Sequence, residues 1–574
     1  MTKPETLRFW QERLQKSRAA YAEALLSMDE NERLYRGERS LRPFVEGVAA
    51  DGEAHHVRNI VAENIESLVD SSIPQPRVRA LRPEDESRAR LIEHLLEGEL
   101  DRLHTEELND MQERTVPIQG GGFWLLEWDN GEGAAALSLV HPKQLIPQEG
   151  VHSLADMDYF FLLQPQTRAQ LSRRYGVTLA GGAEESPEAR GLTDDTAASD
   201  ELLTRCTAYY RDGDRIGLFS WCDDTVLEDL PDCQARLRRV CAACGAADAL
   251  TGESGVCAAC GGEEWQEEAM DWEELWLPVE TAHGAHLPGA RWETDADGQP
   301  ILRPTRIPVY RPGVYPVVLQ KNISLFGQLL GDSDAAKIAD FQNAINWLNQ
   351  KIDRRLMAAG TVITGPASAD FTVDPRDHRI LRLESAADKA MIDTYEFTGD
   401  VSQEFAQLSQ CYEASRQVLG ITDSFQGRRD ETATSGRAKE FAAAQSEGRL
   451  ESKRRMKEAA WARIFELLFR CHLAYSDAPR PVVYTDRRGE TCYDRFDRYD
   501  FLEQDEEGNY YWNDRFAFSC ESTTLGGSRE KLWDEVRRNF DSGAYGDPAT
   551  PEARKTFWQE MQKLHYPLSC GTEE

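Results

Sequence analysis

Two copies of a short cysteine motif constrain this chain more than any other feature of its sequence. The motif reads Cys-Ala-Ala-Cys-Gly, at 241–245 and again at 257–261, with twelve residues between Cys244 and Cys257. Cysteines three positions apart on a tight turn aim two thiolates at one point, and the following glycine permits the positive φ that closes the turn. Two such turns complete a tetrahedral sulfur shell suited to Zn²⁺. The sequence therefore predicts one zinc ion per chain, bound by Cys241, Cys244, Cys257 and Cys260.

Four protein ligands leave no open position for water, so the predicted site is structural rather than catalytic. The segment between the motifs is short and polar, and a metal would replace the core that it cannot build. A redox pair or incidental thiols are the alternatives, but neither explains a duplicated motif. The other eight cysteines are scattered and are expected to be buried, unreactive thiols; they are Cys206, Cys222, Cys233, Cys411, Cys471, Cys492, Cys520 and Cys570.

Zinc ribbons often contact nucleic acid, and the charges around this one test that possibility. Three arginines precede the first motif, at 236, 238 and 239, whereas seven acidic residues follow the second, at 263, 264, 267, 268, 271, 273 and 274. A phosphate would be repelled as much as attracted. The charge balance favours a structural or protein-contact module over a nucleic-acid reader.

The length and charge of the whole chain limit its class. Its 574 residues exceed what one hydrophobic core serves, so several domain-sized units are expected. With 66 Lys and Arg against 100 Asp and Glu, the net charge is −34, which argues against a protein that grips nucleic acid broadly. No apolar run is long enough for a membrane helix, and the first residues lack a signal-peptide pattern. A folded protein made and kept in the cytoplasm is expected.

The first third of the chain predicts helices followed by short strands. Apolar spacing predicts helices over about 5–34, 57–72 and 84–113, the second ending before Pro74. After Gly120-Gly121-Gly122, interpreted as a linker or turn, the pattern changes to strands. These strands are expected at 123–128, 137–140, 159–164, 207–210 and 216–221.

The middle of the chain predicts two helices separated by a small β insert. Apolar residues from Ile338 to Leu356 recur at steps of three and four, close to a heptad seam, behind a helix start at Ser333. Strand-like segments at 361–364 and 380–383 follow, then a helix over about 401–419 that ends at Gly420. A polar loop leads into a very long helix over about 435–474. Between positions 428 and 463 the sequence has ten Lys or Arg residues and six acidic residues. This is the one segment of the chain with a clear positive charge, and we call it the basic island.

Sequence motifs for catalysis are absent. The chain contains no His-Glu-x-x-His, Gly-x-Ser-x-Gly or Walker sequence, and acidic residues are too abundant for any pair to be informative. A charge run is ordinarily a solvated surface. We therefore expect that the protein is not an enzyme.

The order of these elements resembles the portal protein of tailed bacteriophages. The resemblance rests on Tyr35-Arg36-Gly37 after a helix, Asn59-Ile60-Val61 opening the next one, and Ile73-Pro74 ending it. It continues with Gly331-Asp-Ser-Asp before the heptad helix, the β insert, the second helix, the polar loop, and Thr434-Ser435-Gly436-x-Ala438 opening the long helix. It covers roughly residues 30–525, and Ser333 to Ala474 is its most specific part.

The resemblance implies an α+β portal-type fold with a helical stem, a long spine helix, a β-rich wing, a small α/β clip and a zinc-knuckle insertion. The implied units are N-terminal helices and wing (1–312, with the insertion at 236–265), stem helix 1 (313–358), clip (359–400), stem helix 2 (401–420), tunnel loop (421–434), spine helix (435–474), returning wing strands (475–525) and C-terminal crown-like helices (526–574). The zinc-knuckle insertion departs from the minimal family pattern, so the resemblance assigns it no role.

The resemblance also implies a function. About twelve identical subunits would form a ring at one vertex of the virion capsid, assembled in the host cytoplasm. Double-stranded DNA would pass through the ring without sequence specificity during packaging and ejection. The implied protein partners are the large terminase subunit, a head-tail adaptor, and the major capsid and scaffolding proteins. Gln426, Gly427, Arg428 and Arg429 would project from the tunnel loop toward passing phosphates.

Two other functional classes stay open at this point. One is a zinc-ribbon enzyme or regulator associated with nucleic acid, which predicts a basic groove and catalytic acids near the ribbon. The other is a structural adaptor with no role in DNA handling. The tunnel loop likewise has the alternative of an ordinary surface turn.

Overall fold

The computed structural model describes most of the chain. The described residues are 3–38, 58–179, 202–246, 250–251, 256–278, 302–364, 370–373, 379–382, 387, 393–397, 399–421, 436–485, 491–521, 526–546 and 550–563. The fold is mixed α+β, with 46% helix and 28% strand, as the sequence predicts. Within these ranges, the helices are all too short or too polar to cross a membrane.

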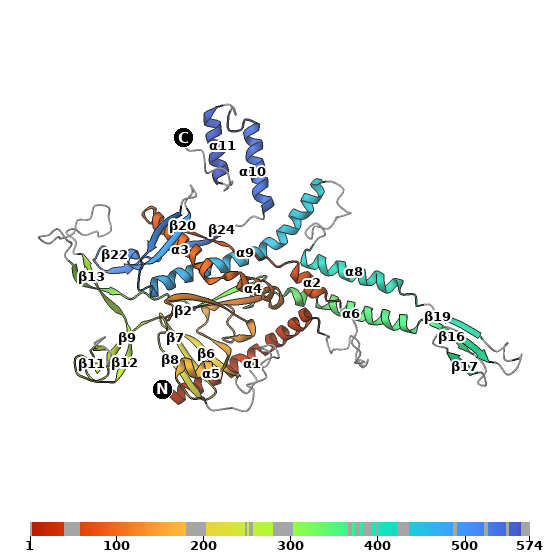
Figure 1. Cartoon of the computed structure of the whole chain (residues 1–574), viewed down its shortest axis with the longest axis horizontal. Coiled ribbons are helices and arrows are strands. Elements are labelled where there is room, and N and C mark those ends of the chain that lie inside the picture. Colours follow the sequence, from red (N-terminus) through yellow and green to blue (C-terminus); the bar gives the residue numbers. More distant parts are fainter. Residues whose placement is uncertain are drawn as a thin grey trace.

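A central body forms around the C-terminal half of the longest helix, α9 (Gly436–Tyr475) (Figure 1). Trp461, Phe465 and Phe469 of this helix are completely buried. They pack on an antiparallel sheet of order β15-β2-β3, formed by Val317–Lys321, Gly121–Asp129 and Ala134–Val140. The rings of Trp461 and Trp124 lie 5.2 Å apart across this contact. The helix predicted at 435–474 is confirmed, and its second half is the centre of the core.

The chain after α9 returns to the same core. Three two-stranded antiparallel sheets surround it together with α3 (Glu86–Leu103). They pair β1 (Gln75–Ala80) with β24 (Phe516–Glu521), β20 (Arg480–Thr485) with β21 (Thr491–Phe496), and β22 (Leu502–Gln504) with β23 (Tyr510–Trp512). The β1–β24 pair joins segments more than 400 residues apart in sequence, so the two ends of the chain share one folding unit.

A five-stranded antiparallel sheet lies beside the body. Its order is β4-β5-β6-β7-β8, formed by Leu145–Pro147, Tyr159–Thr167, Leu202–Asp212, Arg215–Cys222 and Thr225–Leu230. Strand β5 is buried on both faces, which explains its uninterrupted apolar run. Phe160 and Leu162 face the body, whereas Phe161 faces Trp10 of α1 (Lys3–Arg36), at 6.1 Å between ring centroids.

Shorter elements complete this region. Helix α5 (Arg168–Tyr175) follows β5, with Thr167 as its N-cap. Among the described residues, 3₁₀ turns lie at Pro142–Gln144 and Leu154–Asp156 in this region, and at Pro83–Asp85 and Arg498–Phe501 in the central body. The turn at Glu507-Gly508, between β22 and β23, closes a hairpin, with Gly508 at φ +89°.

Two of the predicted N-terminal helices differ from the structure. The second helix is only α2 (Ile60–Glu66), capped by Asn59. The predicted helix over 84–113 is two helices, α3 and α4 (Thr105–Gln119), because His104 takes a left-handed φ of 48°. The apolar stripe continues across this break, so spacing alone does not reveal it.

The triple glycine is not a linker. Gly120 caps α4 at φ +83°, and Gly121 and Gly122 already belong to β2. The Gly120 carbonyl accepts hydrogen bonds from the backbone N–H groups of Asn322 and Gly331, and a Cβ at Gly120 would lie 2.2 Å from the Gly331 carbonyl oxygen. These glycines are required because two backbone segments cross here in contact.

An arm of two antiparallel helices extends from the body (Figure 1). It consists of α6 (Asp334–Ala358) and α8 (Ser402–Leu419), whose ends agree with the predicted starts and stops. The hydroxyl of Ser333 accepts a hydrogen bond from the Ala336 N–H at 3.1 Å, and Gly420 ends α8 at φ +80°. At the far end of the arm β16 (Gly360–Thr364) pairs with β19 (Asp393–Phe397), and β17 (Asp370–Val373) pairs with β18 (Arg379–Arg382).

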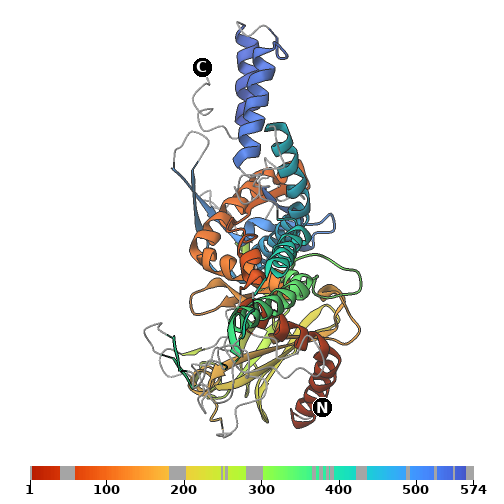
Figure 2. The same ribbon diagram turned by 90° about the vertical axis from the view of Figure 1, so that its right-hand side faces the viewer.

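The C-terminal helices form a separate hairpin. Helices α10 (Gly526–Asp541) and α11 (Pro551–Lys563) stand above the body in both views (Figures 1 and 2). The rings of Phe540 and Phe557 lie 4.6 Å apart between them. The structure therefore contains helices within 526–574, where the resemblance implies them.

Candidate metal centre

The four motif cysteines lie on one projecting hairpin, which we call the cysteine hairpin (residues 236–270). Its stem pairs β9 (Arg236–Cys241) with β12 (Trp265–Met270), and Cys241 lies opposite Trp265. A second small pair, β10 (Leu250–Thr251) with β11 (Val256–Cys257), leads into the second motif. Beyond the stem, β13 (Trp272–Pro278) pairs with β14 (Leu302–Pro308).

Both motifs fold into the same turn. In the first, the Gly245 N–H donates to the Cys241 carbonyl at 2.9 Å, and in the second, the Gly261 N–H donates to the Cys257 carbonyl at 2.8 Å. The two glycines have φ of +70° and +75°, a region that only glycine adopts at low cost. The duplicated sequence thus builds two equivalent turns.

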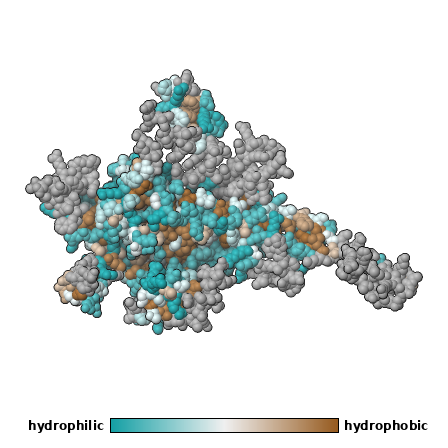
Figure 3. Space-filling model, viewed as in Figure 1, coloured by the Kyte–Doolittle hydropathy of each residue, from teal (hydrophilic) through white to brown (hydrophobic). Residues whose placement is uncertain are grey.

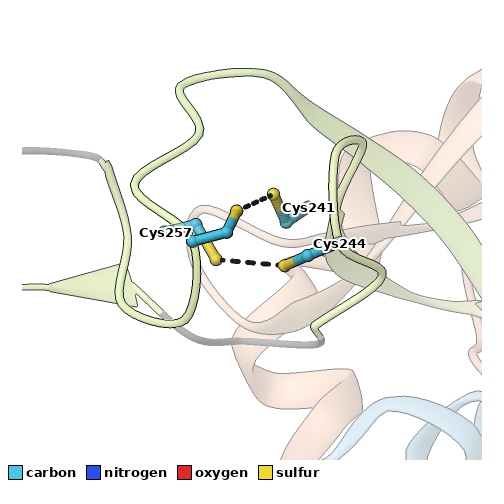
Figure 4. Close-up of side chains that lie close together, drawn as sticks. Cys241, Cys244 and Cys257 are labelled. Atoms are coloured by element: carbon cyan, nitrogen blue, oxygen red, sulfur yellow. Dashed lines mark hydrogen bonds between the residues drawn. The ribbon is translucent and has the colours of Figure 1, made fainter.

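The turns bring the sulfur atoms together, as the labelled side chains in Figure 4 show. Cys241 Sγ lies 3.5 Å from Cys260 Sγ, and Cys244 Sγ lies 3.6 Å from Cys257 Sγ. All four sulfur atoms lie within 4.8 Å of one another. A tetrahedral site with Zn–S bonds of about 2.3 Å has sulfur–sulfur edges of about 3.8 Å. The residues therefore fit a metal such as zinc at this site, as the sequence predicts.

The packing beside the sulfurs agrees with this interpretation. A Cβ at Gly262 would lie 3.2 Å from Cys241 Sγ and 3.4 Å from Cys260 Sγ. Cys241 and Cys257 are buried, whereas Cys244 and Cys260 are exposed. The backbone approaches the cluster closely enough that a side chain at position 262 would crowd it.

The pKa values of the thiols differ because they share so small a space. Hydrogen bonds from the backbone N–H groups of Cys244 and Ala243 lower the pKa of Cys241 to about 7. The pKa of Cys260 rises to about 12: the Gly262 N–H acts to lower it, but the Cys244 and Cys241 thiols outweigh that effect. One thiol of the cluster therefore loses its proton readily, whereas a second thiolate beside it forms only with difficulty. A bound metal cation would compensate the negative charge and allow the further thiolates to form.

A buried charge network anchors the cysteine hairpin to the body. Arg236, at the base of β9, lies 3.0 Å from the Glu273 carboxylate and also pairs with Asp477, just beyond the end of α9. Glu273 pairs in turn with Arg498, which is 1% exposed. This network is not predicted from the sequence, because two of its three ion pairs, Arg236 with Asp477 and Glu273 with Arg498, join residues more than 220 positions apart.

The same pairing disfavours a nucleic-acid reader. Arg236 is occupied by the network, and Arg238 lies 2.8 Å from the carboxylate of its cross-strand neighbour Glu268. Of the three arginines before the first motif, Arg239 is exposed without an ion pair among the described residues. Two of the three cations are thus already matched by carboxylates.

The remaining cysteines are ordinary thiols. Cys206, Cys222 and Cys471 are buried, and Cys233, Cys411, Cys492 and Cys520 are half-buried. Burial raises the pKa of Cys222 to about 11, and raises those of Cys233, Cys471 and Cys520 to about 12. These four are protonated at neutral pH and therefore unreactive, as predicted. Cys570 lies outside the described residues.

The predicted tunnel-loop residues Gln426, Gly427, Arg428 and Arg429 also lie outside the described residues. The described part of the basic island is largely paired. Lys453 pairs with Asp334 at the start of α6, and Lys457 lies 3.4 Å from Glu113. Arg455 pairs with Glu451 at 2.6 Å on the surface of α9. These cations connect elements of the fold, so the local positive charge is smaller than the sequence count indicates.

Comparison with known proteins adds no assignment: no protein-family model matches the chain, and no curated protein matches it significantly.

Proposed function

We propose that this chain is the subunit of a portal-type ring at one vertex of a tailed-bacteriophage capsid. About twelve copies enclose a channel for DNA packaging and ejection, and the ring docks the large terminase subunit and later a head-tail adaptor. The observation that carries the proposal is the arm. It leaves the body as two antiparallel helices, ends in small β pairs, and returns to a long helix that runs into the core (Figure 1).

The arm supports a ring because it is incompletely covered in a single chain. Ile338, Ile345 and Leu348 are buried along the seam of α6. Trp347, Leu356 and Phe405, by contrast, are exposed on the two helices, and an apolar patch is visible on the arm in Figure 3. A two-helix arm that exposes large apolar side chains gains most by packing against identical neighbours.

The proposed division of the chain follows these elements. Helices α6 and α8 are the stem, and the β pairs at 360–397 belong to the clip. Helix α9 is the spine, the sheets around it form the wing, and α10 and α11 form the crown. The tunnel loop is the segment that joins α8 to α9, and capsid and scaffolding proteins meet the wing.

The charge of the chain is compatible with a DNA conduit. Each copy carries −34 at pH 7, so the ring as a whole repels a polyanion and discourages adhesion. Arg428 and Arg429 supply brief, sequence-independent contacts. A channel that must release DNA is better served by an acidic surface with a few arginines than by a uniformly basic wall.

We assign Zn²⁺ as the metal of the cysteine hairpin, one per chain, with a structural role. Its four sulfur ligands leave no open position. When bound, the metal holds two turns that have no core of their own, while Arg236 attaches their stem to the body.

Native mass spectrometry and negative-stain electron microscopy of the purified protein test the proposal. Ring particles of about twelve chains are expected. A species that stays monomeric at every concentration and salt, without ring particles, would overturn it and favour a monomeric adaptor. A monomer that also binds DNA through the cysteine hairpin would favour the zinc-ribbon regulator.

A further inference from the structure

A cavity of 1170 Å³ lies where three parts of the molecule meet. Its walls come from the five-stranded sheet, the base of the cysteine hairpin and the C-terminal end of α9. Apolar side chains on different sides include Leu218, Leu237 and Leu467. The volume slightly exceeds the usual range for small-molecule sites, about 300–1000 Å³, so a ligand with several charged groups has room.

Arg205 of β6 lines this cavity and carries an unmatched charge. Its side chain is 3% exposed, yet it forms no ion pair with the described residues. Its Nε–H donates to the Thr207 hydroxyl at 3.1 Å, which leaves both Nη groups free. Buried arginines are ordinarily paired, because an uncompensated charge away from water is costly. The two Nη groups present the geometry that binds a carboxylate by two parallel hydrogen bonds.

A second unpartnered polar group lies next to Arg205. The guanidinium is 5.8 Å from the centre of the Tyr175 ring, and the Tyr175 hydroxyl is buried without a hydrogen-bond partner among the described residues. Arg174, which precedes it on α5, lines the same cavity. Arg205 and Arg174 thus offer hydrogen-bond donors to the cavity, and the Tyr175 ring lies beside Arg205.

Two carboxylates balance these cations. Glu127 of β2 and Glu228 of β8 line the cavity, and neither forms an ion pair with the described residues. Burial raises the pKa of Tyr175, and Arg205, Arg174, Glu228 and Glu127 each modify it, which locates all these groups in one neighbourhood. The cavity therefore holds opposite charges that are close but not in direct contact.

We propose that this cavity binds a zwitterionic ligand, whose carboxylate is held by Arg205 and whose ammonium group is held by Glu127 and Glu228. A multiply charged anion such as phosphate is disfavoured, because the two glutamates face it and the whole chain is acidic. A free amino acid or the charged end of a polypeptide carries both groups. The site is independent of the proposed ring function.

Four probes, tested on the full-length protein, separate the contributions of the carboxylate and of the ammonium group to binding. L-lysine carries both groups, acetate carries only a carboxylate, and n-butylamine carries only an ammonium group. Inorganic phosphate tests binding of a multiply charged anion. Ligand-observed NMR titration should show saturable binding of L-lysine, at least tenfold tighter than that of each other probe. No saturable binding of L-lysine, or tighter binding of phosphate, would overturn the proposal.

Two variants connect binding to the named residues. Arg205→Met should weaken L-lysine binding at least tenfold, whereas Arg173→Met, an exposed neighbour on α5 outside the cavity, should leave it unchanged. Glu228→Gln should reduce the advantage of L-lysine over acetate while acetate binding persists, and it serves also if Arg205→Met fails to fold. Wild-type affinity for L-lysine in Arg205→Met, or an unchanged preference for L-lysine over acetate in Glu228→Gln, would place L-lysine binding outside this cavity and overturn the proposal.

Discussion

The guanidinium of Arg355 on α6 lies 2.6 Å from the carboxylate of Glu404 on α8, near the far end of the arm. Lys351, one turn earlier on α6, lies 3.0 Å from the same carboxylate oxygen. The hydrogen bond from Lys351 holds the pKa of Glu404 below its usual value. Glu404 is buried between the helices, so one carboxylate connects two cations of the facing helix where the apolar seam of the arm ends.

We expect Glu404→Ala to loosen the distal half of the arm. Removing the carboxylate leaves Arg355 and Lys351 to repel each other and removes the two ion pairs that join α6 to α8. The expected result is faster amide hydrogen exchange at 350–358 and 402–408, with exchange in the body unchanged. Glu451→Ala, which removes an exposed pair with Arg455 on α9, is the matched control and should have little effect. Unchanged exchange at the end of the arm would contradict the role given to Glu404.

The arm shows what the sequence could predict. Its helices have regular apolar spacing, a serine N-cap and a glycine C-cap, all determined by residues within a few positions of one another. The cysteine cluster was predictable for the same reason, since each turn is local and the second repeats the first. The predicted start of α6 at Ser333 and end of α8 at Gly420 therefore agree with the structure.

Features that depend on distant partners were not predictable. The sequence indicates only a linker or turn at Gly120, because the requirement for glycine there comes from Gly331, some 200 residues away. The left-handed backbone of His104 separates α3 from α4, although the apolar spacing across this position predicts one continuous helix. The isolated charge of Arg205 depends on which side chains of other elements line the cavity beside it, which spacing within β6 does not encode.

Metal removal should unfold the cysteine hairpin and leave the body folded. Elemental analysis of protein purified without chelator should give one zinc per chain, and Cys257→Ser should bring this near zero because three sulfur ligands bind zinc far more weakly. In that variant amide exchange should accelerate within 241–262 and stay slow in α9. Cys492→Ser, outside the cluster, is the control and should keep its zinc. Wild-type protein with well under one metal ion per chain would exclude the site.

Acid should destabilise the body through His472 and Glu99, which face each other at 3.4 Å in its core. Burial lowers the pKa of His472 below 6.5, although Glu99 acts in the opposite direction. Burial alone would raise the pKa of Glu99, but hydrogen bonds from His472 and Arg102 lower it from 4.5 to about 2. Arg480, at 3.7 Å from Glu99, adds a further cation.

The titrations of His472 and Glu99 change the folding stability in the same direction. Below pH 6.5 the unfolded chain protonates His472 while the folded chain does not, and between pH 4.5 and 2 the same holds for Glu99, so stability falls as pH falls. Glu99 contributes about 2–3 kcal/mol of this loss. Urea unfolding from pH 7 to pH 3 should show the decline, and Glu99→Gln should flatten its acid part relative to Glu86→Gln, an exposed control on α3. A midpoint independent of pH would reject this account.

The tunnel-loop assignment predicts a separation of assembly from DNA handling. Replacing Arg428 and Arg429 by Ala should leave rings of normal size, because the assignment gives these residues contacts with DNA rather than with neighbouring subunits. Packaging, or retention of packaged DNA, should fall in particles assembled from the variant. Lys439→Ala, a cation that lies beyond the loop in α9, controls for loss of charge alone. Normal packaging by the double variant would reject the assignment.

Phe326 provides a direct test of subunit contact. Its side chain is completely exposed on the turn between β15 and α6, beside the partly exposed Leu325. A fully exposed aromatic side chain lowers the solubility of a protein unless a partner covers it. A Phe buried at an interface contributes about 2 kcal/mol or more to the free energy of association. Phe326→Ser should leave the fold and zinc content unchanged but shift the ring equilibrium toward smaller species, raising the assembly concentration at least tenfold in native mass spectrometry. Ser324→Ala, in the same turn, should assemble as the wild type does; equal assembly of both variants would exclude this turn from the interface.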